Sequence, residues 1–228
     1  MRGRWHGLER SDSDGRPSPG PRRRSGPRRQ PIRAGALGVI GLVAGAAILS
    51  GLFTTAGDAQ PPGETRPIEV SGAPLPQLGP EPDPGVGRPM PELRGTAFDG
   101  QPVRIIRDGK PKVVVFLAHW CPHCQREVPR LAAWLRGGRG PLGVDVYAVA
   151  SATKREAPNY PPSAWLKREG WPAPVLVDDE KGAAAMAVGL SGYPFFVLVD
   201  RAGTVVHRHS GETSIPELER LIARVRGA

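Results

Sequence analysis

The part of the chain from Arg88 onward predicts an α/β domain with a mixed β-sheet. Apolar runs rich in β-branched residues alternate there with segments of helical pattern. The run Val113–Leu117 is apolar throughout, as expected of a strand that is buried on both faces of a parallel sheet. The alternation ends in a hairpin around Asp200–Gly203 and a last helix. Because helical crossovers join parallel strands and a hairpin joins antiparallel ones, one sheet would hold both kinds of pair.

Each element of this domain carries its own local signal. The turn Asp99–Gly100 precedes the first short strand, and the later strands are short apolar runs. Strands are expected at 103–106, 113–117, 144–149, 175–177, 195–199 and 204–207, and helices at 123–136, 162–169, 183–188 and after 214. The last helix has the clearest start, because Ser214 and Glu217 fit a capping box with Pro216 inside the first turn.

The N-terminal tail, residues 1–33, carries most of the positive charge. It holds ten Arg against three acidic residues, which accounts for seven of the nine net charges of the chain. With almost no apolar residues it cannot bury enough surface to fold, so we expect a disordered cytoplasmic tail. The rest of the chain is close to neutral, which argues against a nucleic-acid partner.

Residues 34–53 form an uncharged apolar run that is long enough to cross a bilayer. Twenty residues of helix rise about 30 Å, the thickness of the hydrocarbon core. We interpret the run as a retained single transmembrane helix in the cell membrane, in contact with the lipid bilayer. A cleaved signal peptide is the alternative, since Gly57–Ala59 offers small residues for cleavage. The arginines that precede the run place the N-terminus in the cytoplasm and everything after Phe53 outside.

Residues 54–87 predict a linker between this span and the α/β domain. The segment contains eight prolines, and Pro-rich chain is extended and semi-rigid. We therefore expect an extracytoplasmic stalk that holds the domain of residues 88–228 away from the membrane.

The two cysteines of the chain, Cys121 and Cys124, indicate its chemistry. Two cysteines exclude a disulfide-stapled scaffold and any four-cysteine metal site. Cys121 stands between a predicted buried strand and a predicted helix, where the helix dipole stabilises a thiolate. Cys124 lies one turn later, close enough to form a disulfide with it. Pro122 lacks a backbone donor where a helix can spare one, and a protonated His123 would add positive charge near the thiolate.

Other functions for the cysteine pair are possible. A purely structural bridge would close a very short loop and would stabilise the fold little. Zinc could take His119 and His123 as further ligands, but four ligands within six residues strain a tetrahedron. His207 and His209 are the other histidines that could contribute, from further along the chain. A copper-binding metallochaperone would use both thiolates and a histidine. Thiol–disulfide exchange requires no dissociable cofactor and no metal, and we prefer it.

The surroundings of the pair resemble a known family. The matching segments are 109–111 (GKP), 118–124 (AHWCPHC), 127–129 (EVP), 192–196 (GYPFF) and 200–203 (DRAG). Together they resemble the TlpA/ResA-like group of membrane-anchored thiol–disulfide oxidoreductases within the thioredoxin superfamily. The resemblance covers residues 86–226. It implies a thioredoxin fold, in which helices flank a central mixed sheet, with an N-terminal single transmembrane helix.

The resemblance also implies roles for residues near the pair. Pro194 would be the cis-proline of the family, packed against the cysteines, and Tyr193 would offer its backbone to a substrate strand. Trp120 would cover the site. Glu127, one helical turn after Cys124, would be the active-site acid. The alternative for Glu127 is a solvated residue that pairs with a neighbouring arginine, either Arg126 or Arg130.

The chain departs from the family at two places. Thioredoxin has a buried acid six residues before its first cysteine, where this chain has Val115, so a proton relay must use another group. The Pro–His dipeptide between the cysteines resembles the oxidase DsbA, which leaves the direction of exchange open. We expect a TlpA/ResA-type reductase of cysteine-containing exported proteins, including apocytochrome c, that is supplied with electrons by a membrane thiol-relay protein. A DsbA-like oxidase with a membrane reoxidant is the alternative, besides the copper metallochaperone.

Overall fold

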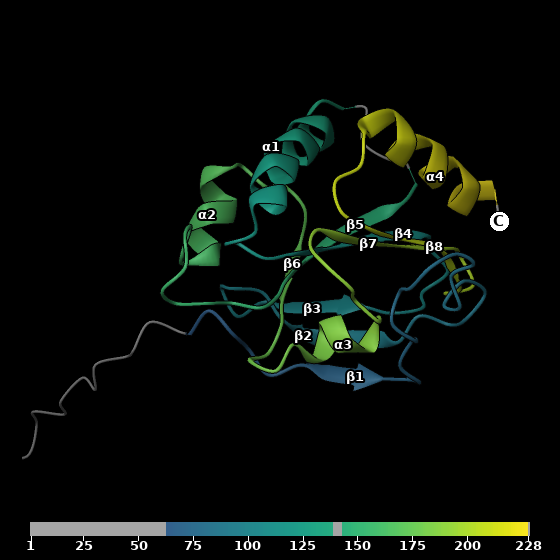
Figure 1. The fold of residues 1–228 in the computed structure, drawn as a ribbon, viewed down its shortest axis with the longest axis horizontal. Coiled ribbons are helices and arrows are strands. Elements are labelled where there is room, and N and C mark those ends of the chain that lie inside the picture. The colour runs from purple at the N-terminus through teal and green to yellow at the C-terminus, as the bar shows by residue number, and fades with distance from the viewer. Residues whose placement is uncertain (1–62, 139–142, 228) are drawn as a thin grey trace, which may run out of the picture. The chain divides into compact units, whose positions relative to one another are not determined.

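A five-stranded mixed sheet forms the centre of the domain (Figure 1). The computed structural model describes residues 63–138 and 143–227. The strand order is β6-β5-β4-β7-β8. The strands are β4 (Lys112–Leu117), β5 (Asp145–Ala150), β6 (Val175–Val177), β7 (Phe195–Val199) and β8 (Val205–Ser210). The β4–β5 and β5–β6 pairs are parallel, whereas β4–β7 and β7–β8 are antiparallel, which confirms the predicted mixed sheet.

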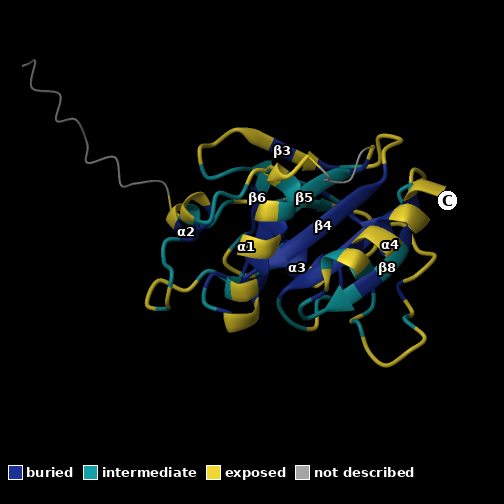
Figure 2. Cartoon of the chain, turned by 90° about the horizontal axis from the view of Figure 1, so that it is seen from above, coloured by how far each residue is buried: buried dark blue, intermediate teal, exposed yellow. Residues whose placement is uncertain are grey.

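Both faces of the sheet are covered, and β4 lies in the middle of the core. All six residues of β4 are buried, and the strand crosses the centre of the domain in Figure 2. One face packs on α1 (Pro122–Arg136), α2 (Pro162–Arg168) and α4 (Ile215–Gly227). The other face packs on α3 (Ala183–Ala187) and on a second sheet. The expected cap of α4 is present, because Ser214 Oγ accepts the N–H of Glu217 at 3.2 Å.

The second sheet has three antiparallel strands in the order β1-β2-β3. They are β1 (Glu69–Ser71), β2 (Glu92–Thr96) and β3 (Pro102–Ile105). Only β3 was predicted from the sequence. In β2 a single side chain, Leu93, is fully buried, so the strand lacks the apolar run that marks the others. Backbone pairing with β1 and β3, rather than side-chain pattern, holds it in place.

Residues 63–87 do not form the free stalk that their prolines predict. Leu75 is buried, and its N–H donates to the carbonyl of Ala187 at 2.8 Å. The N–H of Leu78 donates to the carbonyl of Gly189, also at 2.8 Å. A Cβ on Gly189 would overlap the carbonyl oxygen of Pro76, so a glycine is required at this close approach. Extended chain with interspersed leucines therefore packs as part of the domain.

A buried ion pair fastens the same segment. Arg208, on β8, pairs with Asp83, and its Nε donates to Asp83 Oδ2 at 3.0 Å. Nη1 of Arg208 also donates to the carbonyls of Pro76 at 2.8 Å and Val188 at 2.7 Å. The domain therefore begins upstream of residue 88, where the sequence analysis set its boundary.

The predicted tail and membrane span, residues 1–33 and 34–53, lie outside the described residues. Of the helices within residues 63–138 and 143–227, none combines the length and apolar character needed to cross a membrane.

Candidate active site

Cys121 occupies the N-cap position of α1, directly beyond the carboxyl end of β4. Its N–H donates to the carbonyl of Ala118 at 3.0 Å, which closes the turn between strand and helix. Its backbone is extended (φ −77°, ψ 121°), and Pro122 follows at the first helical position. Proline fits there because its fixed φ suits a helix and its missing N–H would have no partner in the helix. Local sequence thus places both cysteines where they were expected.

The two thiols have different environments. Both cysteines are free, and the exposed fraction is 7% for Cys121 and zero for Cys124. The N–H of Ala118 donates to Cys124 Sγ at 3.5 Å. Burial raises the pKa of Cys124 well above that of a free thiol, and the nearby Cys121 and Glu127 add to the effect. Cys121 is therefore the less deeply buried of the two thiols, and burial favours the protonated form of Cys124.

The backbone of Tyr193, which precedes Pro194, lies directly against Cys121. The Cys121 thiol donates to the carbonyl oxygen of Tyr193 at 3.4 Å, and the Tyr193–Pro194 peptide bond is cis, as the family resemblance implies. The ring of Trp120 stands edge-on to that of Tyr193, with centroids 6.2 Å apart. Trp120 Nε1 donates to the carbonyl of Ala152 at 2.7 Å, which fixes the indole beside the site.

Glu127 is fully buried, so the solvated alternative for this residue is wrong. Its pairing with Arg130 is present, and the N–H of Thr213 donates to its Oε1 at 3.4 Å. Burial raises the pKa of Glu127, while Arg130 opposes that effect. The charge of Glu127 also acts on Cys124, one helical turn away. A buried carboxyl at this position can exchange a proton with its surroundings, and its role as the active-site acid stays a prediction.

His123 faces outward from α1 rather than into the site. Its Nδ1 lies 2.8 Å from Oε1 of Glu212 and 2.8 Å from Nη2 of Arg126. Arg126 also donates to Glu212, so the carboxylate balances positive charge on this face. The expected effect of His123 on the Cys121 thiolate is therefore offset by Glu212.

His119 joins the loop after β5 to the active-site turn. It is buried, its Nε2 accepts the N–H of Lys154 at 3.1 Å, and its Nδ1 lies 2.7 Å from the carbonyl of Pro158. The first partner donates and the second accepts, so the ring is neutral with its proton on Nδ1. Burial lowers the pKa of His119 accordingly. Both nitrogens are engaged, so neither is free to bind the zinc ion of that alternative.

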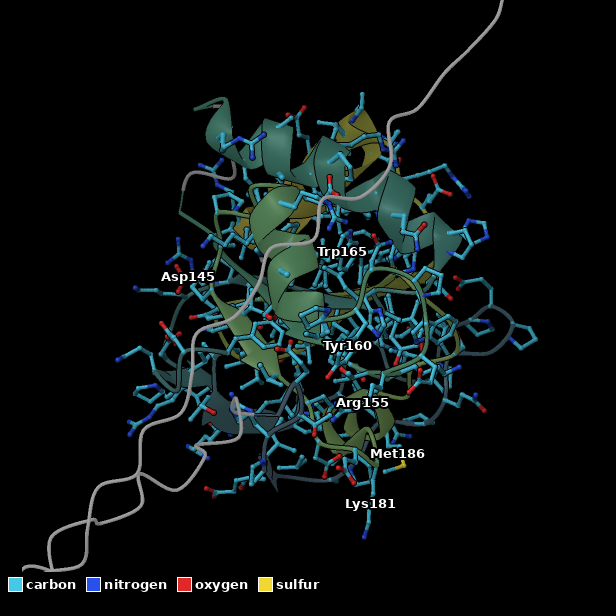
Figure 3. All side chains as sticks on the ribbon, turned by 90° about the vertical axis from the view of Figure 1, so that its left-hand side faces the viewer. Asp145, Arg155, Tyr160, Trp165, Lys181 and Met186 are labelled. Atoms are coloured by element: carbon cyan, nitrogen blue, oxygen red, sulfur yellow. The ribbon has the colours of Figure 1, made fainter. Side chains whose placement is uncertain are left out.

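The same loop carries aromatic and basic side chains. Tyr160 stands edge-on to His119 at 6.0 Å between centroids, and Arg155 lies over the ring of Tyr160 at 5.6 Å. Figure 3 labels Tyr160 and Arg155 below Trp165 of α2. Within the residues that the structure describes, no group of three His, Cys, Asp or Glu side chains is arranged to hold a metal ion.

Two further polar residues at the site were not found from the sequence. Ser151 and Asp178 are buried just past the ends of β5 and β6, and Ser151 contacts the hydroxyl of Tyr193. The available signal was a polar residue directly after each apolar strand, at the edge of the sheet where α/β proteins place their sites.

Known proteins with similar sequences share this domain. Residues 85–222 match the Redoxin family. The chain is 30% identical over 132 residues to "Thiol:disulfide interchange protein DsbE" of Haemophilus influenzae. The aligned region covers 57% of this chain and 68% of that protein. The chain is 31% identical over 110 residues to the Pasteurella multocida protein of the same name, which covers 48% of this chain and 56% of that protein.

Solved structures show the same fold. The structure of "MTB dsbF in its mixed oxidized and reduced forms" superposes with a TM-score of 0.50 at 24% identity, over 58% of this chain and 94% of that one. The thioredoxin domain of a thiol-disulfide oxidoreductase from Bacteroides vulgatus also gives 0.50, at 18% identity, over 62% and 98%. At these identities the likeness establishes a thioredoxin-like α/β fold.

Proposed function

The chain belongs to the redoxin family, and from that premise we propose that it is a membrane-tethered protein that exchanges disulfides with exported proteins outside the cytoplasm. Its described domain is a thiol–disulfide oxidoreductase of the thioredoxin-like kind. The observation that carries the proposal is the asymmetry of the pair: Cys121 keeps a small exposed fraction of 7% beside the Tyr193 carbonyl, and Cys124 is fully buried.

The asymmetry suggests an order of steps. In the reducing direction the Cys121 thiolate attacks one sulfur of a substrate disulfide, and the other substrate sulfur leaves and takes up a proton. Cys124 then loses its proton and attacks Cys121 Sγ. The Cys121–Cys124 disulfide forms, the second substrate thiol is released, and two electrons have passed to the substrate. The oxidising direction runs these steps in reverse.

Cys124 needs a proton acceptor, because burial raises its pKa. We assign this role to Glu127, which is buried one helical turn away and whose own pKa is raised. A carboxyl with a raised pKa is a better base than a solvated one, since its conjugate acid is weaker. Arg130 holds the carboxylate in place from the solvent side.

The proposed direction is that of a TlpA/ResA-type reductase, and apocytochrome c is one proposed substrate. The family resemblance and the similarity to DsbE interchange proteins support an interchange protein, whereas the Pro122–His123 dipeptide supports a disulfide-inserting oxidase. A reductase on the outer side would receive its electrons from a membrane thiol-relay protein. Residues 34–53 would hold the protein in the bilayer. Extraction of membranes with alkaline carbonate tests this tether, because a protein that spans the membrane stays in the membrane fraction.

The reduction potential of the Cys121–Cys124 couple tests the direction. We would equilibrate the full chain in detergent with glutathione buffers and count free thiols. A value near about −270 mV, that of thioredoxin, supports the reductase, and one near about −120 mV, that of DsbA, supports the oxidase. Cys121→Ser should abolish exchange, and Cys124→Ser should accumulate the mixed disulfide. Exchange by the Cys121→Ser variant at the rate of the parent would refute the assignment.

A further inference from the structure

Three polar side chains form a hydrogen-bonded chain that leads from the cysteine pair into the sheet. The hydroxyl of Tyr193 donates to Ser151 Oγ at 3.1 Å, and Ser151 Oγ donates to Asp178 Oδ2 at 2.7 Å. The three residues come from different places: the end of β5, the end of β6 and the loop before β7. Both Ser151 and Asp178 are almost completely buried.

The donors around Asp178 determine the direction of every bond in this chain. Its Oδ1 accepts the N–H groups of Asp179 at 3.0 Å and Ala184 at 2.9 Å, and its Oδ2 accepts that of Ala185 at 3.3 Å. Burial raises the pKa of Asp178, but the N–H groups and the Ser151 hydroxyl oppose that effect and favour the ionised form. An ionised carboxylate only accepts, so Ser151 donates to it. The single hydroxyl proton of Ser151 is then used, and its oxygen can only accept from Tyr193.

The phenol of Tyr193 is therefore a tether and not a proton donor to the cysteines. Its proton points toward Ser151, and burial raises its pKa, so that it stays protonated at neutral pH. At its backbone, the same residue accepts the Cys121 thiol at 3.4 Å. One end of Tyr193 is thus bound to the sheet while the other end faces the reactive sulfur.

The far end of the chain is rigidly held. The N–H of Ser151 donates to the carbonyl of Leu117 at 3.0 Å, and that of Asp178 donates to Ala150 at 2.9 Å. Asp178 also receives N–H groups from the first turn of α3. Since backbone hydrogen bonds to β4 and β5 anchor these two residues, the Tyr193 hydroxyl is bound to a fixed edge of the sheet.

We propose that Ser151 and Asp178 are positioning residues, which hold Tyr193 so that its backbone is ready to pair with an extended cysteine-containing polypeptide. Ordering the acceptor before the substrate arrives lowers the entropy cost of binding. The advantage applies to a peptide segment that pairs with the Tyr193 backbone and not to a small disulfide such as glutathione. The inference rests on the proposed function and specifies its substrate class.

The test compares two substrates across matched variants of the full chain in detergent. The substrates are a short extended peptide that carries one cysteine as a mixed disulfide with glutathione, and oxidised glutathione itself. The variants are Tyr193→Phe, Ser151→Ala and the double variant. Tyr147→Phe is the control, because Tyr147 is a partly buried tyrosine on β5 whose hydroxyl takes no part in this hydrogen-bonded chain.

We expect the ratio of peptide to glutathione kcat/KM to fall about fivefold in Tyr193→Phe and in Ser151→Ala, the effect of one neutral hydrogen bond. The fall should be in KM for the peptide. The double variant should lose no more than the larger single loss, because both act through one chain. Tyr147→Phe should keep the wild-type ratio.

Three results would overturn the inference. The first is an unchanged ratio in Tyr193→Phe, a variant that keeps the ring and its packing and so tests the inference even if Ser151→Ala unfolds. The second is an equal fall in Tyr147→Phe. The third is a double variant whose two losses add fully. If the wild-type protein exchanges with neither substrate, the proposed function is refuted, and this inference with it. The wild-type rates alone distinguish that outcome from the three above.

Discussion

Replacing Asp83 by Asn would leave the guanidinium of Arg208 buried without its counter-charge. The side chain of Arg208 is 0% exposed and that of Asp83 is 4% exposed. Arg208 cannot turn toward solvent without losing its bonds to the carbonyls of Pro76 and Val188. The variant changes one atom and keeps the volume of the side chain, so its effect reports the lost charge.

The expected loss follows from this burial. Removing one partner of a buried ion pair costs about 3–5 kcal/mol of stability. For a domain of this size each kcal/mol lowers the unfolding temperature by about 2–4 °C, so we expect a fall of about 6–20 °C.

Thermal unfolding of the full chain in detergent at pH 7, followed by circular dichroism, measures the loss. Asp99→Asn is the matched control, because Asp99 is exposed and its side chain accepts only a local turn bond from the N–H of Gln101. The control should unfold within about 1 °C of the wild type. If residues 63–87 were only a linker, Asp83→Asn would leave the unfolding temperature as unchanged as the control does.

Acid provides a second test of the same pair. The hydrogen bond from Arg208 holds the pKa of Asp83 below its ordinary value of 3.8. The folded state therefore binds this proton less tightly than the unfolded state, and the stabilisation is complete above about pH 4 and lost as the pH falls through the lower, folded pKa. The difference between wild type and Asp83→Asn should shrink in that range. If Asp83→Asn matches Asp99→Asn at pH 7, residues 72–87 are not part of the folded domain.

Three other changes test different parts of the structure. Burial raises the pKa of Glu127 above 4.5, so urea titrations should show the wild type losing stability as the pH rises from 4.5 through the folded pKa, a loss that Glu127→Gln should lack. Rapid-quench kinetics of Glu127→Gln should show the attack by Cys124 slowed at least tenfold, and an unchanged rate contradicts the assigned base. Burial lowers the pKa of His119 below 6.5, so stability should fall as the pH drops below 6.5, less so in His119→Gln, and equal slopes would mean that the ring is accessible to protons. Phe116→Ala should cost about 3–5 kcal/mol in denaturant unfolding, because Phe116 is fully buried and packs edge-on against Phe195, whereas Val86→Ala, at an exposed position, should change stability by less than about 0.5 kcal/mol.

Features with a local cause could be predicted from the sequence. The apolar run of β4 has to be buried on both faces, and it is. Cys121 starts a helix because Pro122 suits the first helical position, and Ser214 caps α4 through its own side chain. Each of these signals lies within a few residues, where backbone preference and hydrogen bonding act directly.

The state of individual side chains was less predictable. The residues around Glu127 predict an exposed helical acid that pairs with an arginine one turn away, yet the loop at Thr213 covers Glu127. His123 was expected to act on Cys121, but Glu212 draws it to the outer face of α1. In both cases a loop from the far end of the chain decides the outcome, and no local pattern reports its position.

The sequence by itself therefore determined the fold class, the place of the cysteine pair and the residues that border it, since these depend on short-range periodicity and turn chemistry. Only the tertiary structure decided that residues 63–87 belong to the domain and that Ser151 and Asp178 hold Tyr193. Asp83 meets Arg208 across 125 positions, and Ser151 meets Tyr193 across 42. Such contacts form because packing brings polar groups that are distant in sequence into the same buried region. There each group must find a hydrogen-bond partner or lose the free energy of its solvation.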